Sequence, residues 1–299
     1  MPSTKSAILL IAHGSPERVE EVPEFLLQVT GGRPLPPQVV EEVQHRYALI
    51  GSSPLTCWTF EQRDLLHQEL GIPVHVGMRN WKPFIADAVL AMTGEGITHV
   101  VAICLAPQNS RTSVGLYRAA LAKQGPTFTV DFVDSWHDHP LLIKAFAEKL
   151  AAGWKAASQE AGAKIPVIFT AHSVPERTVA DGDPYEAQAK ETAALVGQEA
   201  SLAKDDWTFA FQSQGMSGGA WLGPTVEDTI RDLKAKGHRG VFIQPVGFLC
   251  DHVEVLYDID IGFKQFAEKE GLRLWRAESL NGSPLLTQAL ADLARKRLT

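Results

Sequence analysis

The chain has 299 residues, which at about 150 residues per domain predicts two domains with a sizeable apolar core. Hydrophobic residues make up 45% of the chain and charged residues 21%, so the composition is that of a folded globular protein and excludes a disordered one. Its 28 basic and 35 acidic side chains give a formal net charge of -7. Without a global positive field, the chain is not expected to bind nucleic acid.

The first apolar run, Ala7 to Ala12, predicts a buried strand that ends at His13-Gly14-Ser15-Pro16. It is shorter than the roughly 7–15 apolar residues of a signal-peptide core, and no small-residue cleavage site follows it. No apolar stretch approaches the ~20 residues of a membrane span. We therefore expect a monomeric cytoplasmic protein without an integral membrane segment.

The three cysteines, Cys57, Cys104 and Cys250, are scattered along the chain and form no pair at metal-ligand spacing. A disulfide framework, a structural zinc site and a four-cysteine iron–sulfur cluster therefore lack support. The expected state is that of small buried thiols in a reducing cytosol.

Two distant segments share one layout and indicate an internal repeat. Leu9 to Glu17 and Val167 to Glu176 are each an apolar strand that ends in Ala-His, followed by a small residue and then Pro-Glu. Gly96 to Pro107 and Gly237 to Phe248 form a second pair, each with a glycine, a turn and a buried strand. The repeat predicts two similar α/β lobes.

Amphipathic helices are predicted between these strands, over 83–92 and 226–236, because apolar residues recur there at intervals of three and four. Short continuous apolar strands that alternate with helices imply parallel sheets covered on both faces. The boundary is expected in the Ala/Gly-rich stretch 151–163, which gives an N-terminal lobe over 1–155 and a C-terminal lobe over 156–299. The C-terminal helix is free to pack back on the first lobe.

Ligands of parallel sheets bind beyond the carboxyl ends of the strands, where His13 and His172 are both expected. Neither the G-x-G-x-x-G pattern after a strand nor the phosphate-binding G-x-x-x-x-G-K-[ST] pattern occurs, so the fold class does not imply a nucleotide. A histidine at a strand end can be a hydrogen-bonded structural residue. At the mouth of a sheet, however, a neutral imidazole can bind a metal and accept protons near pH 7.

An acidic segment follows the strand that ends near Val246. A helix that opens with Asp251 would place Asp251, Glu254 and Asp258 on one face, because residues three and four apart are neighbours on a helix. Asp251 and Glu254 also fit a capping box, which is the structural alternative. A row of carboxylates suits a hard divalent ion moving with its waters. His252 is interpreted as a satisfied surface or wall residue.

Basic and aromatic residues are candidates for the wall of a cavity. Trp221 lies in a predicted loop, where its ring would either pack in the core or face a flat substrate. Loops and early helices of the first half carry basic side chains that suit carboxylates, although a solvated surface role is the default for each: Arg33, Arg46, Arg79, Lys82 and Arg111.

Taken together, these motifs resemble those of ferrochelatase, the enzyme family that inserts Fe(II) into a porphyrin to make haem. The resemblance covers almost the whole chain and implies two Rossmann-like lobes without nucleotide, with the active-site cleft between them. The stretches that carry it are His13-Gly14-Ser15-Pro16, Arg46-Tyr47, Ile50 to Leu55, Leu105-Ala106-Pro107, Phe169 to Glu176, Gly182 to Tyr185, Phe211-Gln212-Ser213, Trp221 to Pro224 and Val246 to Asp260.

By this resemblance, His172 is the active-site histidine and Glu254 its partner carboxylate, and both are candidate metal ligands. Metallation removes two pyrrolic protons while a hydrated ferrous ion sheds water, so a base or ligand and a nearby proton-accepting carboxylate are needed. We hypothesise that His172 accepts protons and binds metal, and that Glu254 and Asp258 relay protons or metal.

The resemblance is strongest to the branch that uses coproporphyrin III, although protoporphyrin IX stays an alternative substrate. His13 stands where that branch commonly has a tyrosine that faces the metal from the side opposite His172, so it is a candidate axial ligand of product iron. Two further positions depart from the family pattern. Thr30 stands where a basic residue is often found, and Gly262 interrupts the acidic row one turn beyond Asp258. Residues implied as propionate or wall contacts are Arg46, Tyr47, Ser53 and Tyr117, with Trp221 and His13 also assigned to the substrate.

We expect no tightly bound cofactor and no iron–sulfur cluster, with Fe(II) acting as substrate. The expected partners are the porphyrin, ferrous iron and a transient iron donor or haem acceptor protein. Two alternative functions are a related chelatase for cobalt or nickel and a haem or porphyrin carrier that has lost catalysis.

Overall fold

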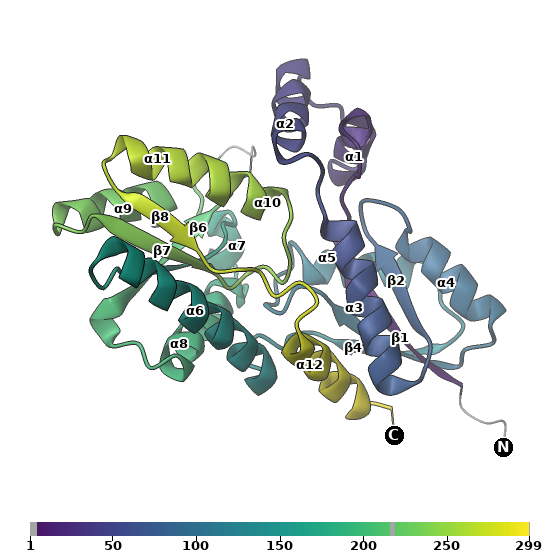
Figure 1. Ribbon diagram of the computed structural model, residues 1–299. Coiled ribbons are helices and arrows are strands. Elements are labelled where there is room, and N and C mark those ends of the chain that lie inside the picture. The colour runs from purple at the N-terminus through teal and green to yellow at the C-terminus, as the bar shows by residue number, and fades with distance from the viewer. Residues whose placement is uncertain (1–4, 216–218, 299) are drawn as a thin grey trace.

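The computed structural model describes residues 5–215 and 219–298, in which two parallel sheets of the same strand order are flanked by helices (Figure 1). The first sheet has the order β2-β1-β3-β4 and the second the order β6-β5-β7-β8. The strands are β1 (Ser6–Ala12), β2 (Val74–Met78), β3 (His99–Cys104), β4 (Thr129–Val133), β5 (Val167–His172), β6 (Trp207–Gln212), β7 (Gly240–Pro245) and β8 (Arg273–Arg276). The predicted α/β fold with two similar lobes is confirmed.

Alternation along β1 explains how the first sheet is covered on both faces. Successive side chains of a strand point to opposite faces. Ala7, Leu9 and Ile11 pack with α4 and α5, whereas Ile8 and Leu10 belong to the core that includes Leu66 of α3. The helices of this lobe are α1 (Val22–Val29), α2 (Pro37–Ile50), α3 (Leu55–Leu70), α4 (Ile85–Gly94) and α5 (Val114–Lys123), with a short 3-10 turn at Val19–Glu21.

The second sheet is also covered on both faces. Phe169 and Phe211 pack with α6 and α8, and Ile168 and Val241 pack with α9 and the helical segment that follows β7. The helices here are α6 (Pro140–Ala161), α7 (Glu176–Ala180), α8 (Tyr185–Glu199), α9 (Val226–Ala235), α10 (Val253–Leu256), a π-helix (Asp258–Phe263) and α11 (Lys264–Lys269), with a 3-10 turn at Lys204–Asp206.

Both predicted amphipathic helices are present with shifted ends. The predicted helix 83–92 is α4, which begins two residues later at Ile85 because the Pro83 carbonyl accepts a hydrogen bond from the backbone N–H of Met78. The predicted helix 226–236 is α9, in which the Thr225 hydroxyl accepts the backbone N–H of Asp228 and caps the first turn. No helix in the described ranges is long and apolar enough to cross a membrane.

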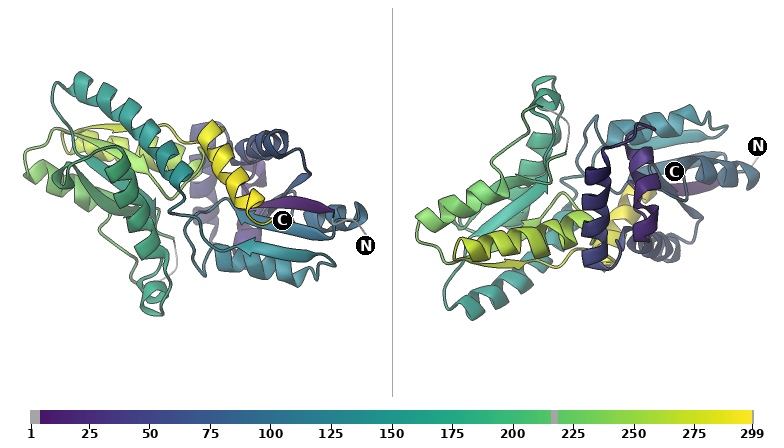
Figure 2. Two further views of the ribbon diagram at one scale, coloured as in Figure 1. Left: turned by 90° about the horizontal axis from the view of Figure 1, so that it is seen from below. Right: turned by 90° about the horizontal axis from the view of Figure 1, so that it is seen from above.

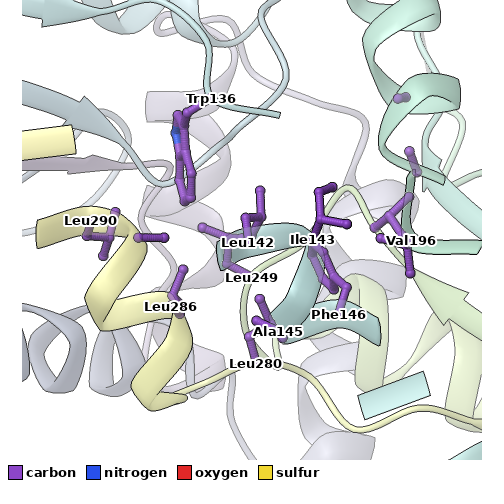
Figure 3. Close-up of a cluster of buried hydrophobic side chains, with 14 of the residues drawn as sticks. Trp136, Leu142, Ile143, Ala145, Phe146, Val196, Leu249, Leu280, Leu286 and Leu290 are labelled. Carbon is purple, nitrogen blue, oxygen red and sulfur yellow. The ribbon is translucent and has the colours of Figure 1, made fainter. Parts of the chain in front are cut away.

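The last helix, α12 (Pro284–Arg295), returns from the second lobe and packs against both α3 and α6 (Figures 1 and 2). Figure 3 shows Leu286 and Leu290 of α12 facing the cluster that contains Trp136 and Leu142. All four side chains are buried. One apolar core therefore continues from lobe to lobe, and the predicted boundary after residue 155 lies inside α6.

Candidate active site

The two repeated histidines occupy equivalent places at the carboxyl ends of interior strands. His13 directly follows β1, and His172 is the last residue of β5. The Nδ1–H of His13 donates to the carbonyl oxygen of Gly14 at 2.9 Å, and the Nδ1–H of His172 donates to the carbonyl oxygen of Ser173. Each backbone contact leaves Nε2 as the atom that can bind a metal or exchange a proton.

His172 meets a carboxylate that lies more than eighty positions further along the chain. Its Nε2 lies 3.4 Å from Oε1 of Glu254, and a third of each side chain is exposed, 33% for both. The tertiary structure therefore brings together the two residues that the sequence analysis places at the centre of the reaction. No three His, Cys, Asp or Glu side chains in the described part of the chain are arranged to hold a metal ion.

His252 is a contact of Glu254 that the sequence analysis missed. Its Nε2 lies 3.5 Å from Oε2 of Glu254, while its Nδ1–H donates to the carbonyl oxygen of Cys250 at 2.9 Å. Glu254 thus has an imidazole beside each carboxylate oxygen. The spacing of two residues gave no signal for this contact, because positions i and i+2 do not face each other on a helix.

The pKa values of the two repeated histidines are shifted in opposite directions. Desolvation lowers the pKa of His13, which favours the neutral ring. Burial also opposes the charged form of His172, but the Glu254 carboxylate outweighs it and the pKa of His172 is raised. Burial opposes ionisation of Glu254 as well, yet His172 and His252 hold the pKa of Glu254 well below its usual value. The pair therefore favours imidazolium and carboxylate.

Asp258 extends the acidic site from the start of the π-helix. The hydroxyl of Ser213 donates to Oδ2 of Asp258, and Nη1 of Arg46 lies 3.8 Å from Oδ1. Burial raises the pKa of Asp258 to about 6 against these two interactions. A carboxylate with a pKa near neutrality can both accept and release a proton under physiological conditions.

The predicted row of three carboxylates is wrong in one member. Asp251 accepts hydrogen bonds from the Ser279 hydroxyl at 2.7 Å and the Asn281 side-chain amide at 2.9 Å, in the loop before α12. The helix begins only at Val253, so Asp251 is neither its N-cap nor on the face that carries Glu254. Helical periodicity failed because the backbone before Val253 is not helical.

Arg46 lies beside the acidic site, and Trp221 lies against the loop that follows His172. Arg46 extends from α2, forms an ion pair with Glu42 at 3.0 Å and has its guanidinium 5.0 Å from the centre of the Tyr257 ring. Trp221 is half-buried and forms a backbone bridge with Pro175, in the loop that follows His172. Their predicted contacts with substrate stay predictions.

Three of the predicted substrate contacts are buried side chains. Tyr47 shares a hydrogen bond of 2.9 Å with the Ser15 hydroxyl beneath the α1–α2 hairpin. Tyr117 lies in the core between α5 and the first sheet, and the Ser53 hydroxyl is buried without a hydrogen-bond partner among the described residues. Tyr47 and Tyr117 belong to two separate apolar clusters, and contact of these three residues with substrate also stays a prediction.

Arg79 stands out from the other basic candidates. It follows β2 directly, and its charge acts on His13 and Tyr117. Within the described ranges its side chain forms neither an ion pair nor a hydrogen bond. A partly buried guanidinium without a partner suits a carboxylate of a ligand. Its position at a strand end is the sequence signal that separates it from Arg33 and Lys82.

Comparison with known proteins places this geometry in a family. The family model described as ferrochelatase matches residues 5–298. The chain is 55% identical to the ferrochelatase of Acidobacterium capsulatum, with 98% of this chain and 95% of the relative covered. It is 35% identical to a coproporphyrin III ferrochelatase of a Geobacillus species, with 100% and 99% covered.

Solved structures support the fold. A sirohydrochlorin chelatase from Bacillus subtilis subspecies spizizenii, in complex with cobalt, has a TM-score of 0.60 at 13% identity and covers 98% of this chain and 95% of its own. That likeness is one of architecture alone, whereas the sequence match spans nearly every residue. The chain belongs to the ferrochelatase family.

Proposed function

We propose that this chain inserts Fe(II) into a porphyrin with release of two protons, as a step of haem synthesis. The observation that carries the proposal is the contact of 3.4 Å between Nε2 of His172 and Oε1 of Glu254 at the carboxyl end of the second sheet. An imidazole beside a carboxylate can accept protons and provide two donor atoms for a divalent ion. The full-length match to ferrochelatases supports the same reaction.

His172 and Glu254 share the central roles in this proposal. Because the pair favours imidazolium and carboxylate, Glu254 is the first group able to meet a ferrous ion, and His172 becomes a ligand or base once its proton leaves. Asp258, with a pKa of about 6, provides the next acceptor along the same segment. The proton and metal steps then run along Glu254 and Asp258.

We propose coproporphyrin III as the porphyrin, with protoporphyrin IX as the alternative. Relatives named coproporphyrin III ferrochelatase align over the whole chain at 35% identity. Coproporphyrin III carries more carboxylates than protoporphyrin IX, and Arg46 and Arg79 bring guanidinium groups near the site. Tyr47, Ser53, Tyr117 and Trp221 complete the proposed substrate environment.

The remaining proposals concern the state of the protein. We propose a lyase-class metal chelatase that acts as a cytoplasmic monomer without a tightly bound cofactor or an iron–sulfur cluster. Its three cysteines lie on separate elements, Cys57 on α3, Cys104 on β3 and Cys250 after β7. A transient iron donor and a haem acceptor are the proposed protein partners.

An anaerobic turnover assay tests the reaction. The wild-type chain is given Fe(II) with coproporphyrin III or protoporphyrin IX, and also Co(II) and Ni(II). We expect many turnovers with Fe(II) and a higher kcat/KM for coproporphyrin III. Binding of porphyrin without turnover would instead indicate a carrier, and turnover with cobalt or nickel alone would indicate a related chelatase.

Two variants test the residues. His172→Ala and Glu254→Gln are each expected to lower kcat by about 10²–10⁴-fold, since each removes a group that handles protons. Glu268→Gln on the exposed face of α11 is the matched control and is expected to keep wild-type kcat. Normal iron insertion by a folded His172→Ala variant contradicts the proposed role of the pair.

A further inference from the structure

One arginine outside the reacting groups holds the segment that carries them. Arg276, the last residue of β8, contacts both oxygens of Asp260: its Nε donates to Oδ1 at 2.8 Å and its Nη2 to Oδ2 at 2.9 Å. Only 14% of the arginine side chain is exposed. A bidentate contact of this kind fixes direction as well as distance.

The third nitrogen of the same guanidinium faces the other end of the segment. Nη1 of Arg276 lies 3.5 Å from Oδ1 of Asp251 and donates to the carbonyl oxygen of Ala277 at 2.8 Å. Asp251 is held in turn by Ser279 and Asn281, as described above. We call Arg276, Asp251 and Asp260 the Arg276 cluster.

The cluster also reaches the first lobe. The backbone N–H of Asp251 donates to the side-chain oxygen of Asn281 at 2.9 Å, and the Gln62 side chain of α3 donates to the backbone oxygen of Asn281 at 2.9 Å. Asn281 has a φ of 48°, in the left-handed region that asparagine tolerates better than most residues. The hydrogen bonds therefore run from α3 to the residues in front of α10.

Glu254 and Asp258 lie between the two aspartates of the cluster. Glu254 comes three residues after Asp251, and Asp258 comes two residues before Asp260. The backbone between them is short and irregular: α10 has four residues, and the π-helix is marked by a bond of 2.8 Å from the N–H of Gly262 to the carbonyl oxygen of Tyr257. So short a helix is not stable alone, and π-helical turns are rare.

We propose that Arg276 is a positioning residue that sets the direction of Glu254 and Asp258 toward His172. It binds Asp251 before the segment and Asp260 within it, so the two carboxylates between them are presented by a backbone held at both ends. Asp258 contacts Ser213 and Arg46 while Asp260 contacts Arg276, which fixes the rotation of the π-helix. This inference rests on the proposed iron insertion.

Kinetics of charge-conserving variants test the proposal. Arg276→Lys keeps the positive charge but removes the bidentate contact, and Asp260→Asn removes one carboxylate while leaving Arg276 near Asp251. Arg273→Lys is the matched control, because Arg273 lies on the same strand and pairs with Glu160 at an exposed position. Circular dichroism and thermal melting first identify the variants that fold. The kinetic assays are then run on these variants at 20 °C.

We expect Arg276→Lys and Asp260→Asn to lower kcat at least tenfold with the KM for porphyrin within twofold of wild type, and Arg273→Lys to change neither. The double variant is expected to be no slower than the slower single variant, because both substitutions remove the same contact between Arg276 and Asp260. Crystal structures are expected to show a longer distance between His172 and Glu254 in Arg276→Lys.

Other outcomes overturn the proposal in distinguishable ways. Wild-type kcat in both folded variants, or a change confined to KM, contradicts the positioning role while leaving iron insertion intact. If Arg276→Lys does not fold, Asp260→Asn alone decides between these outcomes. A wild-type chain that inserts no Fe(II) removes the proposed function, and this inference with it.

Discussion

His13 and His172 show how one local motif acquires two chemical states. Both rings donate Nδ1–H to the carbonyl of the next residue, at the ends of equivalent strands. Among the residues that the structure describes, His172 has a carboxylate 3.4 Å from Nε2 and His13 has none so close, and of the two only the pKa of His172 is raised. The repeat therefore supplies two imidazoles, one that favours the charged form and one that stays neutral.

Because the neutral ring of His13 is favoured, we expect this residue to bind the iron of the haem product. A neutral imidazole with a free Nε2 is a common axial ligand of haem iron. We expect the visible absorption spectrum of the haem-loaded protein to shift in His13→Ala, whereas His67→Ala on α3 should leave it unchanged. Identical spectra for His13→Ala and wild type would exclude axial ligation by this residue.

The carboxylate of Asp258 is expected to lower the stability of the native state while it supports activity. Its pKa of about 6 lies above the ordinary value of 3.8, so the native state holds the proton more tightly than the unfolded chain between these pH values. The ionised carboxylate therefore destabilises the native state above pH 6, by up to about 3 kcal/mol. This penalty decreases as pH falls through 6 and is gone below about 4.

Asp258→Asn should accordingly raise the free energy of unfolding by about 1–3 kcal/mol at pH 7.5 and by much less at pH 4, while kcat falls. Urea denaturation at the two pH values measures the stability, and the anaerobic assay measures kcat. An equal gain at both pH values would show that the charge of Asp258 is not its cause.

At the scale of elements, the junction between β1 and the following loop depends on a glycine. Gly14 has a φ of +85°, and a Cβ placed there would lie 2.8 Å from both the backbone nitrogen and the Cβ of Trp81. The same junction holds His13, whose carbonyl oxygen accepts the backbone N–H of Asn80 at 2.9 Å. The conformation and the close approach both require a residue without a side chain.

Gly14→Ala is therefore expected to destabilise the protein by about 2 kcal/mol or more, since left-handed backbone alone costs about 1–2 kcal/mol. The control is Gly94→Ala at the end of α4, where a Cβ meets open space. That change should be neutral or stabilise by up to about 1 kcal/mol. Thermal melting of the two variants side by side measures the difference, and equal melting temperatures would contradict it.

The segment from Asp251 to Phe263 marks the limit of periodicity as a predictor. Spacing of three and four residues predicts a single helix that begins at Asp251, but α10 begins at Val253 and becomes π-helical after Tyr257. The charges of Glu254 and Asp258 both raise the pKa of His172, whereas their roles in the reaction stay predictions. Asp251 instead accepts hydrogen bonds from the side chains of Ser279 and Asn281, which take the place of the backbone N–H groups that an N-cap carboxylate would bind.

At the scale of the whole molecule, α12 joins the two lobes. It packs between α3 and α6, and one buried cluster includes residues of both sheets (Figures 2 and 3). Polar contacts of α12 reach both sides: Arg295 forms an ion pair with Glu69 of α3 at 2.7 Å, and Asp292 lies within hydrogen-bond distance of His139, before α6, at 2.9 Å. The position of one lobe therefore depends on the other.

A substitution at Leu290 measures how much the packing of α12 contributes to the stability of the protein. The side chain has no exposed surface, so Leu290→Ala should lower the free energy of unfolding by about 2–5 kcal/mol. Leu90→Ala on α4, where 74% of the side chain is exposed, is the control and should change it by less than about 0.5 kcal/mol. Urea unfolding of both variants measures these values.

Because the core is shared, fluorescence and circular dichroism should report a single unfolding transition in the wild-type chain. Two separate transitions would show that the lobes unfold independently and that α12 contributes little to their association.

The amino-acid sequence alone was sufficient to predict the two similar α/β lobes and the strands that lead to His13 and His172. It also indicated the family, in part through the stretch from Val246 to Asp260. These features are local in the chain, where apolar periodicity and motif spacing are visible. The tertiary structure alone decided that His252 and His172 contact opposite oxygens of Glu254, that Arg79 lies beside His13, and that Arg276 joins Asp251 to Asp260. Such contacts depend on where loops bring residues from distant positions, and no local pattern in the chain encodes that distance.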